Sequence, residues 1–460
     1  MDSLTKREEE KLPHISHGLM QRVSENWGWV VTLGVTIIWF LIVGSQYVYA
    51  LTFLKLQQDF NGSATMVGLI GSIYLSLGCG LSPVTSLLQR RYSHRMITIM
   101  AVLITSVSYI LSSFMDSLIF LVFTFGVLSG IGYNFVYTSL NHLLVCYFPS
   151  KKCRGPIAIA NAGQTIAQLG LSPAIEKLLS LYGWRWTLRI QGTVICLVGL
   201  LACIVLKKPP VWKTSEKEDK KSKKCHSGQL MAVLKLPETW IFSMSTFLTG
   251  VASTFLYVYI GSYIVSKGLS EEQSATGMML IGCGSLAVCL IGSILINRIC
   301  FPVIYLIPVV CVLKACTFTI MTFVQTFRSV NIMCLVIGVL RTGYNILLVP
   351  PAVELLGTSR ALEATTIAIS SLGFGYFSGS YVSGKMFDAF GSYDIALYIC
   401  AALYITSATL ALIAPLYQRY FVPDRYMVDI KVTAINDENK NVLTSTNYER
   451  LFIEERESVI

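Results

Sequence analysis

The chain has 460 residues, of which 53% are hydrophobic and only 13% are charged, with a formal net charge of +10. Soluble domains carry roughly 25% charged residues, so too little polar surface exists to cover a water-soluble body of this size. The composition also excludes disorder, collagen and coiled coil. It predicts an all-α protein of the lipid bilayer, in which the positive charge reflects membrane orientation and not nucleic-acid binding.

An apolar run of about 20 residues is long enough to cross a bilayer as a helix. Twelve such runs are present, at 27–50, 64–88, 96–114, 118–147, 155–176, 187–206, 238–266, 273–296, 302–324, 331–353, 362–385 and 393–417. Six precede a charged segment and six follow it, which is the layout of two pseudo-symmetric halves. The predicted domains are a tail (1–26), a six-helix half (27–206), a basic flexible linker (207–237), a second six-helix half (238–417) and a C-terminal tail (418–460).

Lys and Arg are distributed unevenly between the two sets of loops. The loops on the side of the two termini hold 17 of them, and the opposite loops hold 7. By the positive-inside rule, both termini and the central linker are cytoplasmic. We expect a multi-pass protein of the plasma membrane.

The thirteen cysteines lie mostly within apolar runs, where they are typical small packing residues. We expect no structural disulfide, no metal site and no cofactor.

Charged or titratable side chains inside a span are costly and mark candidate functional positions. Arg341 lies near the middle of the tenth span, Lys314 near the middle of the ninth, and His142 toward the inner end of the fourth. No Asp or Glu lies in the middle of any span. His142 titrates in a suitable range for a proton carrier, and its alternative role is that of a hydrogen-bonded structural residue.

Five short motifs lie at span boundaries: Trp27-Gly28-Trp29, Ser82-Pro83-Val84 with Arg91-Tyr92-Ser93-His94-Arg95, Tyr147-Phe148 with Ala158-Ile159-Ala160-Asn161-Ala162-Gly163, Tyr182-Gly183-Trp184-Arg185, and Gly384-Lys385-Met386-Phe387-Asp388-Ala389-Phe390-Gly391-Ser392-Tyr393. With these motifs the chain resembles the monocarboxylate transporter family of the major facilitator superfamily, over nearly the whole membrane portion. They occur in the family's order and at the expected boundaries. The resemblance implies the major facilitator fold and transport by alternating access.

The chain departs from the proton-coupled lactate carriers of that family. These have a Lys in the first span, where this chain has Val48, and an Asp and an Arg in the eighth span, near Ser285 and Cys289 here. Because no charge remains in the eighth span, obligatory proton symport is not expected.

The resemblance places the first, fourth, seventh and tenth spans around a central cavity and the ninth outside it. Arg341 then faces the cavity and would grip a carboxylate through two hydrogen bonds, or would serve as a tie between helices. Polar and aromatic side chains at helical spacing on the cavity-lining spans complete the predicted substrate site: Asn345, Asn134, Tyr137 and Tyr257. Lys314 would bind a helix-end carbonyl, extend to the membrane surface, or contact a single-span accessory subunit of the kind this family uses.

A gate is predicted at the cytoplasmic face. Arg91 and Arg95 occupy the family's basic loop, and Arg298 lies in the equivalent loop of the second half, where Glu354 is a candidate partner. The alternative is that these charges only set the orientation in the membrane.

The predicted function is transport of a small organic anion, a monocarboxylate or an aromatic, amino-acid-like acid, by a facilitative carrier. One alternative is a proton-coupled lactate and pyruvate symporter. Another is a transport-silent membrane sensor or scaffold that signals through the tail from Gln418 to Ile460. No phosphate-binding loop, nucleophile elbow or zinc signature stands out, so an enzyme is not expected.

Overall fold

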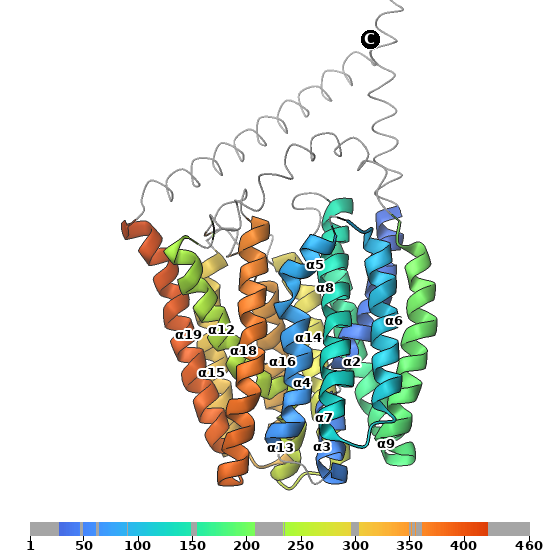
Figure 1. Cartoon of the computed structure of the whole chain (residues 1–460). Coiled ribbons are helices and arrows are strands. Elements are labelled where there is room, and N and C mark those ends of the chain that lie inside the picture. The colour runs from blue at the N-terminus through green and yellow to red at the C-terminus, as the bar shows by residue number, and fades with distance from the viewer. Residues whose placement is uncertain are drawn as a thin grey trace, which may run out of the picture.

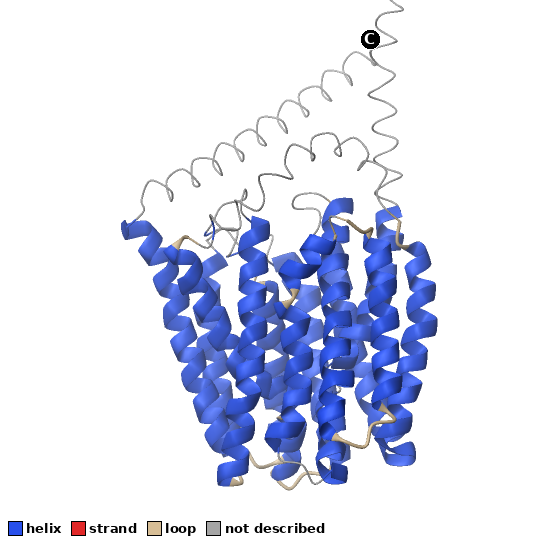
Figure 2. Ribbon diagram, in the orientation of Figure 1, coloured by secondary structure: helices blue, strands red, loops and turns tan. Residues whose placement is uncertain are grey.

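The computed structural model describes residues 27–46, 49–60, 64–89, 91–148, 154–207, 233, 235–295, 303–348, 351, 355 and 361–421. Most of the predicted tails and linker, as well as Arg298 and Glu354, lie outside these residues. The described residues form helices and connecting loops with no strand (Figure 2). The predicted all-α class is therefore confirmed.

The helices follow one another in a bundle (Figure 1). The elements are η1 (Trp39–Val43), α2 (Gly44–Gln46), α3 (Tyr49–Phe60), α4 (Ala64–Gly80), α5 (Ser82–Leu88), α6 (His94–Ser112), α7 (Leu118–Leu121), η2 (Val122–Leu128), α8 (Ser129–Tyr147), α9 (Arg154–Val205), α12 (Pro237–Val258), α13 (Ile260–Ser266), α14 (Glu271–Leu295), η4 (Val303–Tyr305), α15 (Leu306–Phe323), α16 (Phe327–Ile346), α18 (Ala361–Phe390) and α19 (Asp394–Phe421). Residues 27–38 are also helical and lead into η1.

Every predicted span has a helical counterpart, although the helices are divided differently from the prediction. Eight described helices are each long and apolar enough to cross a membrane, and the bent pair Thr65–Gly80 and Ser82–Leu88 makes a ninth. The first predicted span is a shorter apolar helix, Trp27–Val43, followed by α2 and α3. The fifth and sixth spans are joined in α9, and the eleventh is α18.

Helix α9 consists of two helices separated by a kink at Gly183, whose φ of 74° is a left-handed conformation. A Cβ atom in this conformation costs about 1–2 kcal/mol. We therefore expect Gly183→Ala to lower the thermal unfolding midpoint of the purified protein. Gly170→Ala in the same helix is the matched control, because neither Gly170 nor Gly183 has a neighbour within 4 Å of an added Cβ. Equal midpoints for the two variants would contradict the role of the backbone conformation.

The two ends of the bundle contain different segments of the chain. The described chain begins at Trp27 and stops at Phe421 at one end, here called the termini end (Figure 1). The opposite end, here called the loop end, holds the end of α3, the helix α13 and the start of α14. The helices before residue 207 are called the N-terminal half, and those after residue 236 the C-terminal half.

The most extensive contacts between the halves run along two pairs of helices. Helix α4 packs against α18, and α14 packs against α9, whereas α12 packs against α18 and α19 within the C-terminal half. Small residues allow this close approach: a Cβ atom at Gly373 of α18 would lie 2.5 Å from the backbone nitrogen of Gly80. The outward faces are apolar, as expected of a surface in lipid, with large exposed side chains such as Leu181, Leu201, Phe323 and Phe374.

Candidate functional site

Arg341 is buried inside the bundle at only 3% exposure, although it carries a permanent charge. It lies on α16, and its Nη2 atom donates hydrogen bonds to Oε1 of Gln168 at 2.7 Å and to Oγ of Ser285 at 2.8 Å. Gln168 belongs to α9 of the N-terminal half, and Ser285 belongs to α14 of the C-terminal half. The guanidinium therefore joins the two halves at the pair of helices where α9 meets α14.

Ser285 is fixed so that its hydroxyl oxygen faces Arg341. Its hydroxyl lies 2.8 Å from the carbonyl of Ile281 and 3.1 Å from that of Gly338. The O–H therefore points toward backbone, and the oxygen lone pairs remain for the guanidinium. Both of these acceptors of Arg341, Gln168 Oε1 and Ser285 Oγ, are neutral.

Gln168 offers a second donor at the same place. Its side chain is fully buried, and its Nε2 atom has no hydrogen-bond partner among the described residues. A buried amide N–H without an acceptor costs about 1–3 kcal/mol. An anionic oxygen that bound beside Arg341 would supply the missing acceptor.

Aromatic rings form the wall of the site on the C-terminal side. The guanidinium carbon of Arg341 lies 5.8 Å from the ring centroid of Tyr257, which is itself 4% exposed. Tyr257 meets Tyr376 edge to face at 5.6 Å. The structure thus brings together two residues of the predicted site, Arg341 and Tyr257.

Lys314 points into the bundle, contrary to the expectation from the outer position of the ninth span. It is 3% exposed, and its Nζ atom lies 4.3 Å from the ring centroid of Tyr344 and 5.2 Å from that of Tyr404. The predictions of a bond to a helix-end carbonyl and of extension to the membrane surface are wrong for the described residues. Its burial also leaves the ammonium out of reach of an accessory subunit. Helix α15 packs on α16 and α19, whose tyrosine rings take the place of water around the ammonium.

Lys314 adds to the positive charge around Arg341. The helices that carry the two cations, α15 and α16, pack against each other. No carboxylate within the described ranges forms an ion pair with the Lys314 ammonium. Two buried cations on the neighbouring helices α15 and α16 favour a nearby anion.

The remaining predicted site residues lie elsewhere. Asn345 is half-buried one turn beyond Arg341, and its side chain makes no hydrogen bond within the described part of the chain. Asn134 is fully buried; its Nδ2 donates to the carbonyl of Gly78 at 2.7 Å, and its Oδ1 accepts from Thr85. Asn134 therefore joins α8 to α4 and α5 within the N-terminal half, and its contact with a substrate stays a prediction.

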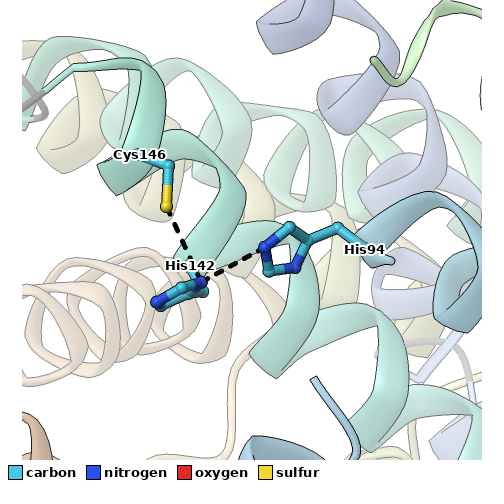
Figure 3. A group of neighbouring side chains, drawn as sticks. All are labelled: His94, His142 and Cys146. Atoms are coloured by element: carbon cyan, nitrogen blue, oxygen red, sulfur yellow. Dashed lines mark hydrogen bonds between the residues drawn. The ribbon is translucent and has the colours of Figure 1, made fainter. Parts of the chain in front are cut away.

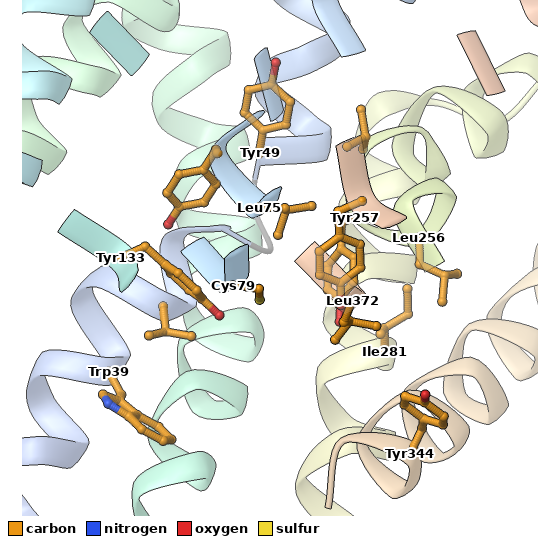
Figure 4. Packing of buried hydrophobic residues seen from close by; sticks show 14 of the residues in the cluster. Trp39, Tyr49, Leu75, Cys79, Tyr133, Leu256, Tyr257, Ile281, Tyr344 and Leu372 are labelled. Atoms are coloured by element: carbon orange, nitrogen blue, oxygen red, sulfur yellow. The ribbon is translucent and has the colours of Figure 1, made fainter. Parts of the chain in front are cut away.

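Tyr137 belongs to an aromatic stack on the N-terminal side of the bundle. It stacks on Trp39 at 5.4 Å and on Tyr133 at 5.7 Å. Figure 4 shows Trp39 and Tyr133 on one side of the packed interior, with Tyr257 and Tyr344 on the other. The indole N–H of Trp39 is buried without a partner among the described residues, which gives the N-terminal side a further donor.

The structure locates closing contacts at the loop end, whereas the sequence predicted a gate at the termini end. Arg91 and Arg95 are exposed at the termini end, and the pair predicted for Arg298 and Glu354 lies outside the described residues. At the loop end, Lys55 Nζ lies 2.8 Å from Glu271 Oε2. These contacts join α3 of one half to α14 of the other.

A second contact closes the loop end between α4 and α18. The backbone nitrogen of Thr65 donates to Asp388 Oδ2 at 3.2 Å, and the Thr65 hydroxyl donates to the same oxygen. In the sequence, Asp388 was quoted only as part of a motif, and its position just beyond the predicted eleventh span (362–385) was the available signal; in the structure it lies in the last turn of α18. Together these contacts leave at this end a cavity of about 20 Å³, which is room for one water molecule. It is lined by Leu51, Lys55, Glu176, Leu179, Gly261, Glu271 and Ser274.

Comparison with known protein families identifies the overall class. Residues 29–352 match the model of the Major Facilitator Superfamily. The chain belongs to this superfamily. It is therefore a membrane transporter of the major facilitator fold, as the motifs at its span boundaries predicted.

Individual relatives agree with the predicted resemblance to monocarboxylate transporters. Monocarboxylate transporter 12 of Mus musculus is 24% identical over 419 residues, which cover 84% of each chain. Monocarboxylate transporter 11 of Mus musculus is 23% identical over 389 residues, covering 83% of this chain and 86% of the relative. Monocarboxylate transporter 10 of Rattus norvegicus is 24% identical over 407 residues, covering 84% and 78%.

Solved structures of the same fold are more distant in sequence. A D-xylose-proton symporter superposes with a TM-score of 0.66 at 13% identity, over 83% of this chain and 97% of its own. The xylose transporter of E. coli in a partially occluded inward-open conformation gives 0.65 at 14% identity, over 86% and 100%. These similarities concern the fold alone.

Proposed function

We propose that this superfamily member carries a small organic acid, as its carboxylate anion, across the membrane by alternating access. Arg341 is the anchor of the carboxylate, with Gln168 as a second donor. The substrate class is a monocarboxylate, or an aromatic or amino-acid-like acid. The similarity to proteins named monocarboxylate transporters supports this class.

The observation that carries the proposal is the set of donors around Arg341. The guanidinium lies beside the unpartnered Nε2 of Gln168, and the Lys314 charge acts on the same region. A carboxylate accepts hydrogen bonds through two oxygens, so it can bind Arg341 and Gln168 at the same time. A neutral sugar offers no charge to balance the cations.

The aromatic rings around Arg341 and Gln168 suit the part of the substrate that lies beyond its carboxylate. Tyr257 lies against Arg341, with Tyr376 edge to face behind it. Flat apolar walls favour a hydrocarbon or aromatic body over a polyhydroxylated one. The substrate is then held by charge at one end and by burial at the other.

We propose that transport is facilitative. A proton-coupled carrier needs a group that gains and loses its proton while exposed to each side in turn, and no Asp or Glu occupies a span centre in the sequence. We also propose that the termini end is cytoplasmic, from the excess of Lys and Arg in its loops, and that the protein resides in the plasma membrane.

The test is uptake of radiolabelled acids by liposomes that contain the purified protein. The panel includes short monocarboxylates, aromatic acids and a neutral sugar, each with and without an imposed pH gradient. We expect saturable uptake of one or more acids and none of the sugar, and no accumulation above equilibrium once substrate ionisation is taken into account. Uphill accumulation driven by protons would establish the symporter instead, and the absence of acid uptake would overturn the substrate class.

A further inference from the structure

A cluster of three side chains with metal-binding atoms lies at the start of α6 and in the last turns of α8 (Figure 3). His94 Nε2 and His142 Nδ1 are 3.4 Å apart, and Cys146 Sγ lies 3.8 Å from the same His142 Nδ1. All three atoms lie within 4.8 Å of one another. The cluster belongs to the N-terminal half and takes no part in the proposed carboxylate site.

We propose that His94, His142 and Cys146 form a binding site for one Zn²⁺ ion. This inference goes beyond the proposed transport function and does not depend on it. Zinc prefers nitrogen and sulfur ligands in a tetrahedral arrangement, with Zn–N of about 2.0–2.1 Å and Zn–S of about 2.3 Å. The chain supplies three of the four ligands, and water supplies the fourth.

The spacing of the atoms agrees with the edges of such a tetrahedron. With these bond lengths and tetrahedral angles, two nitrogen ligands lie roughly 3.3 Å apart, and a nitrogen and a sulfur roughly 3.6 Å apart. The observed separations are 3.4 Å and 3.8 Å. The third edge, between His94 and Cys146 Sγ, is at most 4.8 Å, so it must shorten by up to about 1.2 Å for a tetrahedral site.

Neighbouring groups orient the ligands for this role. His94 Nδ1 lies 3.4 Å from Oγ of Ser139, a fully buried residue one turn before His142 on α8. A proton on Nδ1 that is donated to Ser139 leaves the Nε2 lone pair directed at the cluster. Hydrogen bonding of the second ring nitrogen fixes the tautomer of metal-binding histidines in this way.

The helix geometry also suits chelation. His142 and Cys146 are four residues apart on α8, so both side chains lie on the same face. Both are partly exposed, whereas His94 is buried, so the fourth position faces the accessible side of the cluster. A bound ion would connect the first residue of α6 to α8 and stabilise their contact at the termini end.

The experiment uses the full-length protein in detergent, with any affinity tag removed and prior treatment with a chelator. Titration with ZnCl₂ against a competing chromophoric chelator should show one tight site per chain. His142→Ala and Cys146→Ser should weaken it roughly 100-fold, and Ser139→Ala roughly 10-fold, as removal of an orienting group does. Cys316→Ser is the matched control, because this exposed cysteine lies on α15 in the other half, and it should leave the affinity unchanged.

Co²⁺ binding separates a metal site from a cluster with a purely structural role, because only ligation of the metal gives an absorption signal. Co²⁺ bound at this site should give a thiolate-to-metal absorption band that disappears in Cys146→Ser and persists in Cys316→Ser. Each variant should unfold at the temperature of the wild type when no metal is present. If wild type and His142→Ala bind zinc equally, or if neither binds, the cluster is a hydrogen-bonded chain from Ser139 through His94 to His142, and the proposal is wrong.

Discussion

Arg341→Gln is expected to reduce uptake of the preferred acid at least about 30-fold per folded molecule. Removal of a buried cation that binds an anionic partner costs about 2 kcal/mol or more, and no other guanidinium contacts Gln168 within the described residues. Arg341→Lys keeps the charge but loses the two-pronged geometry, so uptake should fall about tenfold. The measurement is initial uptake rate in liposomes, divided by the amount of folded protein.

The matched control is Arg328→Gln, since Arg328 lies on the same helix but is exposed. It should leave uptake unchanged. The neutral amide of the preferred acid should bind poorly to the wild type, and this preference should shrink in Arg341→Gln. If Arg341→Gln instead lowers the yield of folded protein while uptake per molecule stays constant, Arg341 is a structural tie between the halves.

Asp388→Ala is expected to open the loop end. A hydrogen bond to a charged group contributes about 1.5–3 kcal/mol, and the carboxylate of Asp388 accepts two from Thr65 across the halves. Its loss should shift the balance of states toward opening at this end by about tenfold or more. The reporter is Ser274→Cys, because Ser274 lines the small cavity there and is 1% exposed.

A membrane-impermeant maleimide added outside intact cells should then label Cys at position 274 about ten times faster in the Asp388→Ala background. The matched control is Asp394→Ala, whose carboxylate binds Lys267 within the C-terminal half at the same end. That control should leave the labelling rate unchanged. Equal acceleration by both substitutions would show a general loosening of the loop end, and no labelling in any background would contradict the proposed orientation.

The sequence predicted the class of fold well because bilayer thickness fixes the length of an apolar run. All twelve runs are helical in the structure, but their boundaries depend on local backbone geometry that hydropathy does not report. Gly183 shows this: a single residue with a positive φ breaks the helical segment between the fifth and sixth predicted spans. The domain boundaries at 206 and 237 stay predictions, because most of the linker lies outside the described residues.

In the candidate site, the sequence identified only the residues that stand out individually. Arg341 was identified from its charge inside a span, and Tyr257 from its helical spacing. Gln168 was missed, because its neutral side chain does not stand out in the sequence. Only the packing of α9 on α14 shows that it lies beside Arg341. Lys314 was assigned to the outside from its span number, whereas its long side chain reaches the rings of α16 and α19. The loop-end pairs were missed because their members are 216 and 323 residues apart.

The direct contact between α4 and α18 has a mechanical consequence. Gly373 meets the backbone of Gly80, the last residue of α4, and a Cβ atom at Gly384 would lie 2.6 Å from the Cα of Thr65, the second residue of α4. Backbones in contact resist compression steeply while still permitting rotation. We infer that, in the proposed alternating-access cycle, the two helices act as a fulcrum, so that separation of the halves at one end brings them together at the other. Such a lever would keep both ends from being open at once and would prevent a leak across the membrane.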